Sequence, residues 1–311
     1  MSSTAGSTFP RRRGPRRGTY SIVARDPRTG AIGVAVQSHW FNVGSIVPAA
    51  SAGVGAVATQ ANPDVQHKPR ALRMLREGRS AAEVVPALLA GDPAAAHRQF
   101  AVVDTSGLAV GHTGPMCIPA AGHVTGEGLV CQANMMRTTD VWPAMAEAYE
   151  ATIGRGLTAA LLAALDAAEL AGGDIRGRQA ASILIVPAEG TDADRIVDVR
   201  VDDAPEPLKE VRRLVALNDA YVLADEGDAF MAHGDMTSAA DRYIAAYESA
   251  PGNDELRFWA GLGLLTASMP DRGLALLRET IAADASWREL LHRLSPEVVP
   301  AAPDAIRLLE S

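Results

Sequence analysis

Segments with strand-like patterning stop at residue 203, and the segments after residue 207 have helical periodicity. In the first part, short β-branched and apolar runs are bounded by glycine, proline and aspartate, which is typical of strands and turns. In the last part, apolar residues recur every three or four positions, as on one helix face. The chain of 311 residues is long enough for two domains. The sequence therefore predicts an α+β domain over residues 19–203, a linker at 204–207 and an all-α domain over residues 208–311.

The order of elements within residues 19–203 constrains the architecture further. Strands are expected at 19–26, 31–40, 45–50, 53–60, 99–104, 108–112, 126–134, 181–187 and 195–201, and helices at 68–77, 80–89, 141–152 and 157–170. Ser80 and Glu83 match a capping box at the start of the second helix, and Pro86 is expected to kink or break that helix. Strands and helices come in blocks, so we expect an αββα sandwich rather than a doubly wound parallel sheet.

Residues 1–18 precede the first strand and are rich in arginine, glycine, proline and serine. This composition predicts a disordered, solvated basic leader. No apolar segment follows its arginines, as an export signal requires, and no stretch of the chain approaches the roughly 20 apolar residues that span a bilayer. We therefore expect a cytoplasmic protein with no membrane partner.

Charge and residue usage exclude several classes of function. The net charge of −8 disfavours nucleic acid as a partner. The two cysteines, Cys117 and Cys131, match neither a disulfide framework nor a zinc motif and are expected to be reduced thiols. The seven histidines have no metal-binding spacing, and the phosphate loop, dinucleotide fingerprint and serine-hydrolase elbow are missing, so neither a metal nor a cofactor is predicted.

The helical part contains an internal repeat. Residues 220–253 have large, small and helix-breaking residues where a tetratricopeptide repeat has them, namely Leu223, Gly227, Phe230, Ala239, Tyr243, Ala246 and Pro251. A shift of 34 residues places Gly261, Leu264 and Leu277 under Gly227, Phe230 and Tyr243. The second unit, residues 254–287, is looser, with Gly273 in place of Ala239 and Ala285 in place of Pro251. We expect a tetratricopeptide-like domain that binds a protein or peptide, the alternative being an unrelated bundle of helical hairpins.

Five motifs of the first domain resemble the domain-of-unknown-function family 1028, from Thr19 to about Arg213. They are TYSIVARD at 19–26, GVAV at 33–36, AGVGAVATQ at 52–60, GGDIRGRQA at 172–180 and RVDD at 200–203. The resemblance implies the αββα sandwich of N-terminal-nucleophile hydrolases. Some members of the family carry a C-terminal extension regarded as a peptidoglycan-binding module.

The resemblance also implies a catalytic role for Thr19. Family members usually begin Met-Thr-Phe-Ser, so removal of the methionine exposes a threonine whose own α-amine acts as the base, and Thr19 matches that threonine. Here eighteen residues precede Thr19, and an acylated nitrogen cannot be the base. Either the chain is cut between Gly18 and Thr19, or the domain is a non-catalytic relative. The Gly18–Thr19 junction is similar to the self-processing site of isoaspartyl-peptidase-type hydrolases.

Further polar residues are candidates for the site. Asn134 is expected to donate to an oxyanion, because the family often has Gln-Gly-Asn where this chain has Gln132-Ala133-Asn134; a buried asparagine that satisfies a turn is the alternative. Thr59 and Gln60 are expected to line the pocket, unless they are ordinary polar residues at a strand end. The remaining candidates, Asp174, Arg176 and Gln179, bind a substrate carboxylate or amide, or else form an internal salt bridge. Ser38 and His39 cannot both line one face of their strand.

These observations lead to three competing functions. The first is an amidohydrolase that cleaves a small amide or peptide-like C–N bond through Thr19 and works as a monomer or a homo-oligomer. The second is a non-catalytic scaffold that binds a partner peptide through the helical part. The third is a cell-wall-binding protein, and the missing export signal disfavours it. A free Thr19 amine distinguishes the first function from the second.

Overall fold

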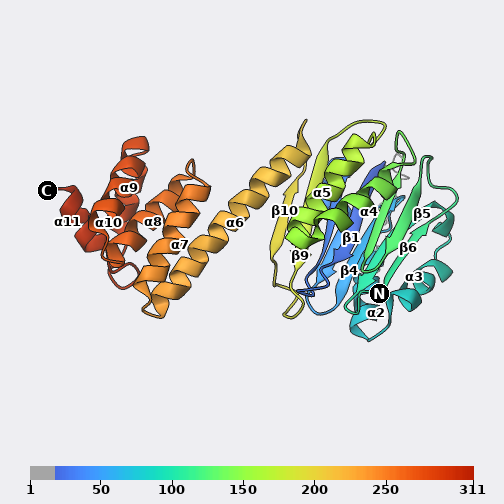
Figure 1. Ribbon diagram of the computed structural model, residues 1–311, viewed down its shortest axis with the longest axis horizontal. Helices are drawn as coiled ribbons and strands as arrows, with labels where there is room; N and C mark the ends of the chain where they lie inside the picture. Colours follow the sequence, from blue (N-terminus) through green and yellow to red (C-terminus); the bar gives the residue numbers. More distant parts are fainter. Residues whose placement is uncertain (1–17) are drawn as a thin grey trace, which may run out of the picture. The chain divides into compact units, whose positions relative to one another are not determined.

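A computed structural model of the protein describes residues 18–311. The chain forms two compact units that divide between Val211 and Arg212, inside the long helix α6 (Pro207–Ala232). The first unit contains the β-sheets, and the second is built from helices (Figure 1). Of the expected basic leader, residues 1–17 lie outside the described residues.

The first unit contains two antiparallel sheets. The six-stranded sheet has the order β10 (Val197–Val201), β9 (Ala180–Val186), β2 (Ile32–Ser38), β1 (Thr19–Arg25), β8 (Leu129–Asn134) and β7 (Gly122–Gly126). The four-stranded sheet has the order β3 (Pro48–Ser51), β4 (Gly55–Ala61), β5 (Arg98–Asp104) and β6 (Ala109–Thr113). The predicted mixed domain is confirmed, since antiparallel sheets and helices are followed by a helical region.

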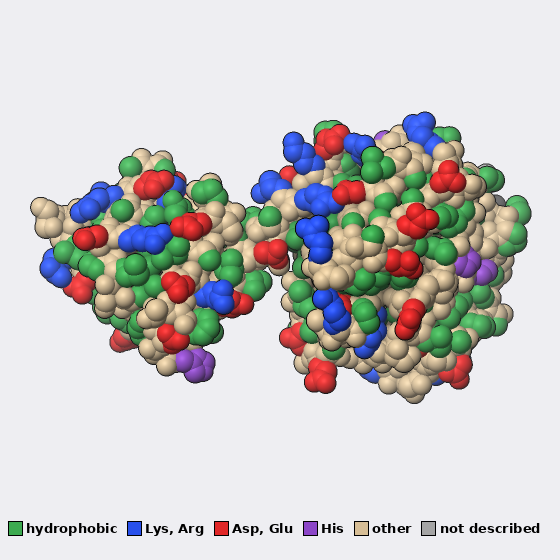
Figure 2. Space-filling view, viewed as in Figure 1, with side chains coloured by type: hydrophobic (Ala, Val, Ile, Leu, Met, Phe, Trp, Pro, Cys, Tyr) green, Lys and Arg blue, Asp and Glu red, His purple; other side chains and the backbone are tan. Residues whose placement is uncertain are grey.

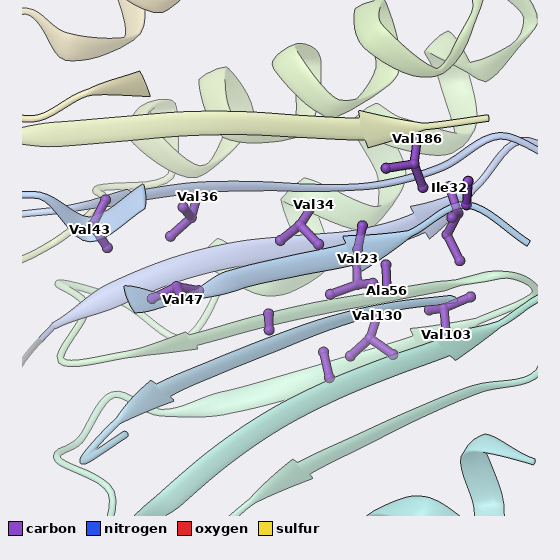
Figure 3. Packing of buried hydrophobic residues seen from close by; sticks show 14 of the residues in the cluster. Val23, Ile32, Val34, Val36, Val43, Val47, Ala56, Val103, Val130 and Val186 are labelled. Atoms are coloured by element: carbon purple, nitrogen blue, oxygen red, sulfur yellow. The ribbon is translucent and has the colours of Figure 1, made fainter. Parts of the chain in front are cut away.

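Helices cover the outer face of each sheet. The pair α4 (Val141–Thr152) and α5 (Leu157–Leu170) packs on the six-stranded sheet, and α2 (His67–Arg76) and α3 (Ala81–Ala90) pack on the four-stranded sheet (Figure 1). Shorter helical turns are α1 (Val43–Ile46), η1 (Ala95–His97) and η2 (Ile153–Arg155). The two sheets face each other across a core of small apolar side chains, among them Val23, Val103 and Val130 (Figure 3).

The layer between the sheets is apolar at one end and polar at the other. Along β1, Val23 joins the apolar core, whereas Ser21 hydrogen-bonds to Gln60 of β4. Because side chains alternate along a strand, Thr19 lies on this same inner face, while Tyr20 points outward and bonds Glu169 of α5. Thr19 and Ser21, at the start of β1, therefore point their side chains into the space between the sheets.

Two expectations about strands were wrong, and the helix does not break at Pro86. Ser45 and Ile46 belong to α1 rather than to a strand. The strand β7 has no counterpart among the expected strands, because Gly122–Gly126 is half-buried and poor in apolar residues. Helix α3 continues through Pro86, which lies on its exposed side, and the predicted capping box of Ser80 and Glu83 is present.

The second unit consists of the rest of α6 and of five further helices. These are α7 (Met236–Ser249), α8 (Asp254–Thr266), α9 (Pro270–Ala283), α10 (Ser286–Arg293) and α11 (Ala302–Leu309). A Cβ added at Gly227 of α6 would lie 2.8 Å from the ring of Tyr243 in α7, and one at Gly261 of α8 would lie 2.8 Å from Leu277 in α9. The glycines therefore permit close approach of paired helices.

Acidic and basic side chains are interspersed over the visible face of each unit (Figure 2). Within residues 18–311, none of the helices combines the length and apolar character that crossing a membrane requires.

Candidate active site

Thr19 begins β1, a central strand between β2 and β8, and it is 2% exposed. Its Oγ1 donates to the carbonyl oxygen of Gly18 at 2.6 Å and lies 3.1 Å from Oγ of Ser38, at the end of β2. The Ser38 hydroxyl also donates to the Gly18 carbonyl. Since Thr19 has one hydroxyl proton, it bonds either the Gly18 oxygen or the Ser38 oxygen at a given moment.

A charged donor completes the surroundings of the Gly18 carbonyl. Nη2 of Arg176 donates to this oxygen at 2.7 Å. The same nitrogen lies 2.8 Å from Oδ2 of Asp174, whose side chain is 0% exposed. The carbonyl before Thr19 is therefore polarised by two hydroxyls and a guanidinium, which is the kind of arrangement that stabilises a developing oxyanion.

The fold holds Asp174 at this position through the segment that follows α5. This segment runs back along the end of β8, where Met136 and Asp174 form an antiparallel bridge. The backbone nitrogen of Ile175 donates to the Met135 carbonyl at 3.1 Å, and that of Arg137 donates to the Gly173 carbonyl at 3.1 Å. Since Thr19 pairs with Asn134 at the end of β8, these bonds bring Asp174 and Arg176 beside Thr19.

Amide side chains between the sheets hold the other side of Thr19. Nε2 of Gln60 donates to the Thr19 carbonyl at 3.1 Å and to Oε1 of Gln99 at 2.8 Å. Nδ2 of Asn134 donates to the same Gln99 oxygen at 3.0 Å, and its distance of 3.5 Å to the Thr19 carbonyl is long for a hydrogen bond. Gln99 therefore aligns two amides toward the backbone of Thr19.

The structure brings together most of the residues that the sequence singles out. The buried members of one cluster are Gly18, Thr19, Gln60, Asn134 and Asp174, and the half-buried Arg176 borders it. Thr59 lies apart from this cluster. It shares a face of β4 with Val57, which packs against α2 and α3, whereas Gln60 is on the opposite face. Gln179 also lies apart, and its amide donates to Asp203 at 3.1 Å near the surface.

Two residues of the cluster were not among the sequence candidates for catalysis or binding. Ser38 lies on the same face of β2 as Val34 and Val36, and so points between the sheets, whereas the neighbouring His39 is exposed. Gln99 is fully buried in β5, directly before the apolar run at residues 100–103. The sequence alone could have pointed to Gln99, because an amide next to a buried apolar run needs buried hydrogen-bond partners.

Other nucleophiles and metal ligands have less suitable surroundings. Burial raises the pKa of the thiols of Cys117 and Cys131, which disfavours the reactive thiolate. Neither thiol therefore has the lowered pKa that is typical of a reactive cysteine. Among residues 18–311, no three histidine, cysteine or acidic side chains are grouped as a metal site would need.

Fold and site together define an α+β protein whose two antiparallel sheets enclose a buried threonine and its donors. The family described as "Family of unknown function (DUF1028)" matches residues 19–211, and the chain belongs to this family. A Silicibacter pomeroyi protein of known crystal structure, described with the same family, is 34% identical, with a TM-score of 0.57 over 63% of this chain and 84% of that chain. No curated protein matches the chain.

Proposed function

We propose that the first unit is an N-terminal-nucleophile amidohydrolase that exposes Thr19 by cutting its own chain after Gly18. One observation carries this proposal: the Gly18 carbonyl oxygen accepts from Ser38 and Arg176 while the Thr19 hydroxyl lies against it. Each such donor typically contributes roughly 100- to 1,000-fold to acyl transfer. The αββα sandwich of this enzyme class is part of the same proposal, and the layers of helices and sheets support it.

Self-cleavage follows from these contacts in two steps. First, Oγ1 of Thr19 attacks the Gly18 carbonyl carbon, and its proton passes to Ser38 as Ser38 gives its own proton to the Gly18 oxygen. The bond from Gly18 to the Thr19 nitrogen then breaks, and the nitrogen takes the proton from that oxygen, which leaves an ester between Gly18 and Thr19. Second, water hydrolyses the ester and releases a Gly18 carboxylate and a Thr19 with free hydroxyl and α-amine.

Turnover of a small amide substrate reuses the same groups. An α-amine has a pKa of about 8, so part of it is neutral near pH 7 and accepts the proton of Oγ1. The hydroxyl oxygen attacks the substrate carbonyl, the amine product leaves with a proton, and water hydrolyses the acyl-enzyme. Ser38 and Arg176 donate to the acyl oxygen, while Gln60 holds the Thr19 carbonyl at 3.1 Å. In this scheme Asn134 and Gln60 position the nucleophile, and Ser38 and Arg176 stabilise the oxyanion.

The test is a time course of intact mass for the full chain and three variants. Thr19→Val keeps the shape of the side chain and removes the nucleophile, so we expect no cleavage. Ser38→Ala removes one donor and the proton relay, so we expect cleavage roughly 100-fold slower than in the wild type. Thr29→Val, in the exposed turn after β1, is the matched control and should cleave normally. Cleavage of Thr19→Val at the wild-type rate would refute the proposal.

We also propose that the second unit is a tetratricopeptide-like domain with a protein or peptide partner. Two close helix contacts support this proposal, one at Gly227 and one at Gly261. The two glycines are 34 residues apart, which is the length of one such repeat. The two cysteines are free, which fits the reducing cytoplasm in which we place the protein. If the chain is never cut, partner binding by this unit becomes the leading function.

A further inference from the structure

Resting on the proposed function, we infer that the site accepts glycyl-type acyl groups and rejects L-aminoacyl groups that carry a side chain. The ion pair of Asp174 and Arg176 closes the space beside the acyl α-carbon. This inference names the acyl part of the substrate, which the proposed cleavage of an amide leaves open.

Gly18 shows where the acyl group lies. During self-cleavage, the Gly18 carbonyl carbon becomes bonded to Oγ1 of Thr19. In the acyl-enzyme of turnover, the substrate's carbonyl carbon forms this same bond to Oγ1. The space around Gly18 in the uncut chain is therefore the space that the substrate's acyl group occupies later.

That space has no room for a side chain. A Cβ added at Gly18 would lie 2.8 Å from Oδ2 and 2.9 Å from Oδ1 of Asp174, and 3.0 Å from Nη2 of Arg176. Favourable contacts of carbon atoms occur at about 3.5–4.0 Å, so Asp174 or Arg176 would have to move. A methyl group already meets both carboxylate oxygens, and any larger L side chain begins with the same atom.

Asp174 is held too firmly to move at low cost. Its Oδ1 accepts from the backbone nitrogen of Arg176 at 2.9 Å and from Nε of Arg176 at 3.1 Å. Its Oδ2 accepts from the backbone nitrogen of His39 at 3.1 Å. A carboxylate that is 0% exposed loses these bonds without gaining water when it is displaced.

The same ion pair links the size of the acyl group to the rate of acyl transfer. Nη2 of Arg176 donates both to Asp174 and to the acyl oxygen, at 2.8 and 2.7 Å. Displacing the pair to admit a side chain therefore also withdraws a charged donor from the oxyanion. We expect an L-alanyl group to react about 100-fold more slowly than a glycyl group, the effect of one lost donor.

The first test compares self-cleavage of full-length Gly18→Ala with that of the wild type by intact mass. Gly91→Ala is the matched control, because a Cβ there meets no atom within 4 Å. We expect about 100-fold slower cleavage for Gly18→Ala and normal cleavage for Gly91→Ala. In an Asp174→Ala background, which opens the space, cleavage of the glycine and alanine chains should differ by less than about threefold, well below the effect of a lost donor.

The second test needs no variant. The self-cleaved protein is given N-acetylglycine 4-nitroanilide and N-acetyl-L-alanine 4-nitroanilide, which mimic the acylated nitrogen of Gly18. We expect the glycyl compound to be hydrolysed about 100-fold faster than the alanyl compound. If the wild type cleaves itself and Gly18→Ala cleaves equally fast, or if both anilides are hydrolysed equally, this inference is wrong and the proposed function stands. If the wild-type chain stays whole, the proposed function fails, and this inference fails with it.

Discussion

Removing the guanidinium of Arg176 should destabilise the first unit because it leaves the carboxylate of Asp174 buried without a counter-ion. The side chain of Asp174 is 0% exposed and that of Arg176 is 25% exposed. Breaking a buried pair by removing one partner costs about 3–5 kcal/mol. Backbone nitrogens of His39 and Arg176 still donate to the carboxylate, so we expect the lower end, about 3 kcal/mol, for Arg176→Met.

Neutralising the carboxylate should recover most of this loss. Asp174→Asn has nearly the same shape, and its amide oxygen still accepts from a backbone nitrogen. We therefore expect the double variant Asp174→Asn/Arg176→Met to be about 2 kcal/mol more stable than Arg176→Met alone, because the buried side chain left behind carries no charge.

The assay is unfolding in urea, monitored by hydrogen exchange of peptides from residues 19–211. This readout reports on the first unit separately. All chains carry Thr19→Val, so that self-cleavage does not alter the state being unfolded. Equal stability of the single and double variants would show that Asp174 does not depend on Arg176. The description of the buried pair would then be wrong.

Two further predictions concern stability. Gln99→Leu removes the oxygen that accepts from Gln60 and Asn134, so each of these buried amides loses a partner, and the free energy of unfolding in urea should fall by about 2–4 kcal/mol. Burial lowers the pKa of His67, so as the pH falls below about 6.5 the unfolded chain takes up this proton before the folded chain does. Stability should therefore fall from pH 7 to 5, and His67→Gln should remove up to about 1.4 kcal/mol per pH unit from that slope.

Each of these predictions has a matched control. Gln179→Leu removes an exposed amide and should change the free energy of unfolding by less than about 0.5 kcal/mol. An equally small effect of Gln99→Leu would contradict the network. His233→Gln, which makes the same exchange at an exposed histidine of the second unit, is the control for His67→Gln. If His67→Gln keeps the wild-type slope, burial of His67 does not contribute to the change of stability with pH.

Periodicity predicts helices well where one face is buried along their whole length. The helices at 141–152 and 157–170 have the expected bounds, because apolar residues recur at helical spacing and Gly156 separates the two. The strand β7 could not be predicted in this way. Its half-buried residues depend on pairing with β8, which is a contact between segments and not a property of the segment itself.

The candidate site was predictable in its residue types but not in its geometry. The resemblance points to Thr19, and alternation places Gln60 and Thr59 on opposite faces of one strand without saying which face is inward. The partner sheet decides this, since Ala56 and Ala58 pack into the core between the sheets and so direct Gln60 inward. The role of Ser38 likewise depends on the pairing of β2 with β1.

The central claim is that Thr19 becomes the first residue of the working protein. Intact mass combined with N-terminal sequencing of the purified full-length chain tests it directly. We predict a main species of residues 19–311 that begins Thr-Tyr-Ser-Ile, together with a released peptide that ends at Gly18. A protein that keeps the residues before Thr19 after prolonged incubation would contradict the account, and the helical unit would then be the place to look for function.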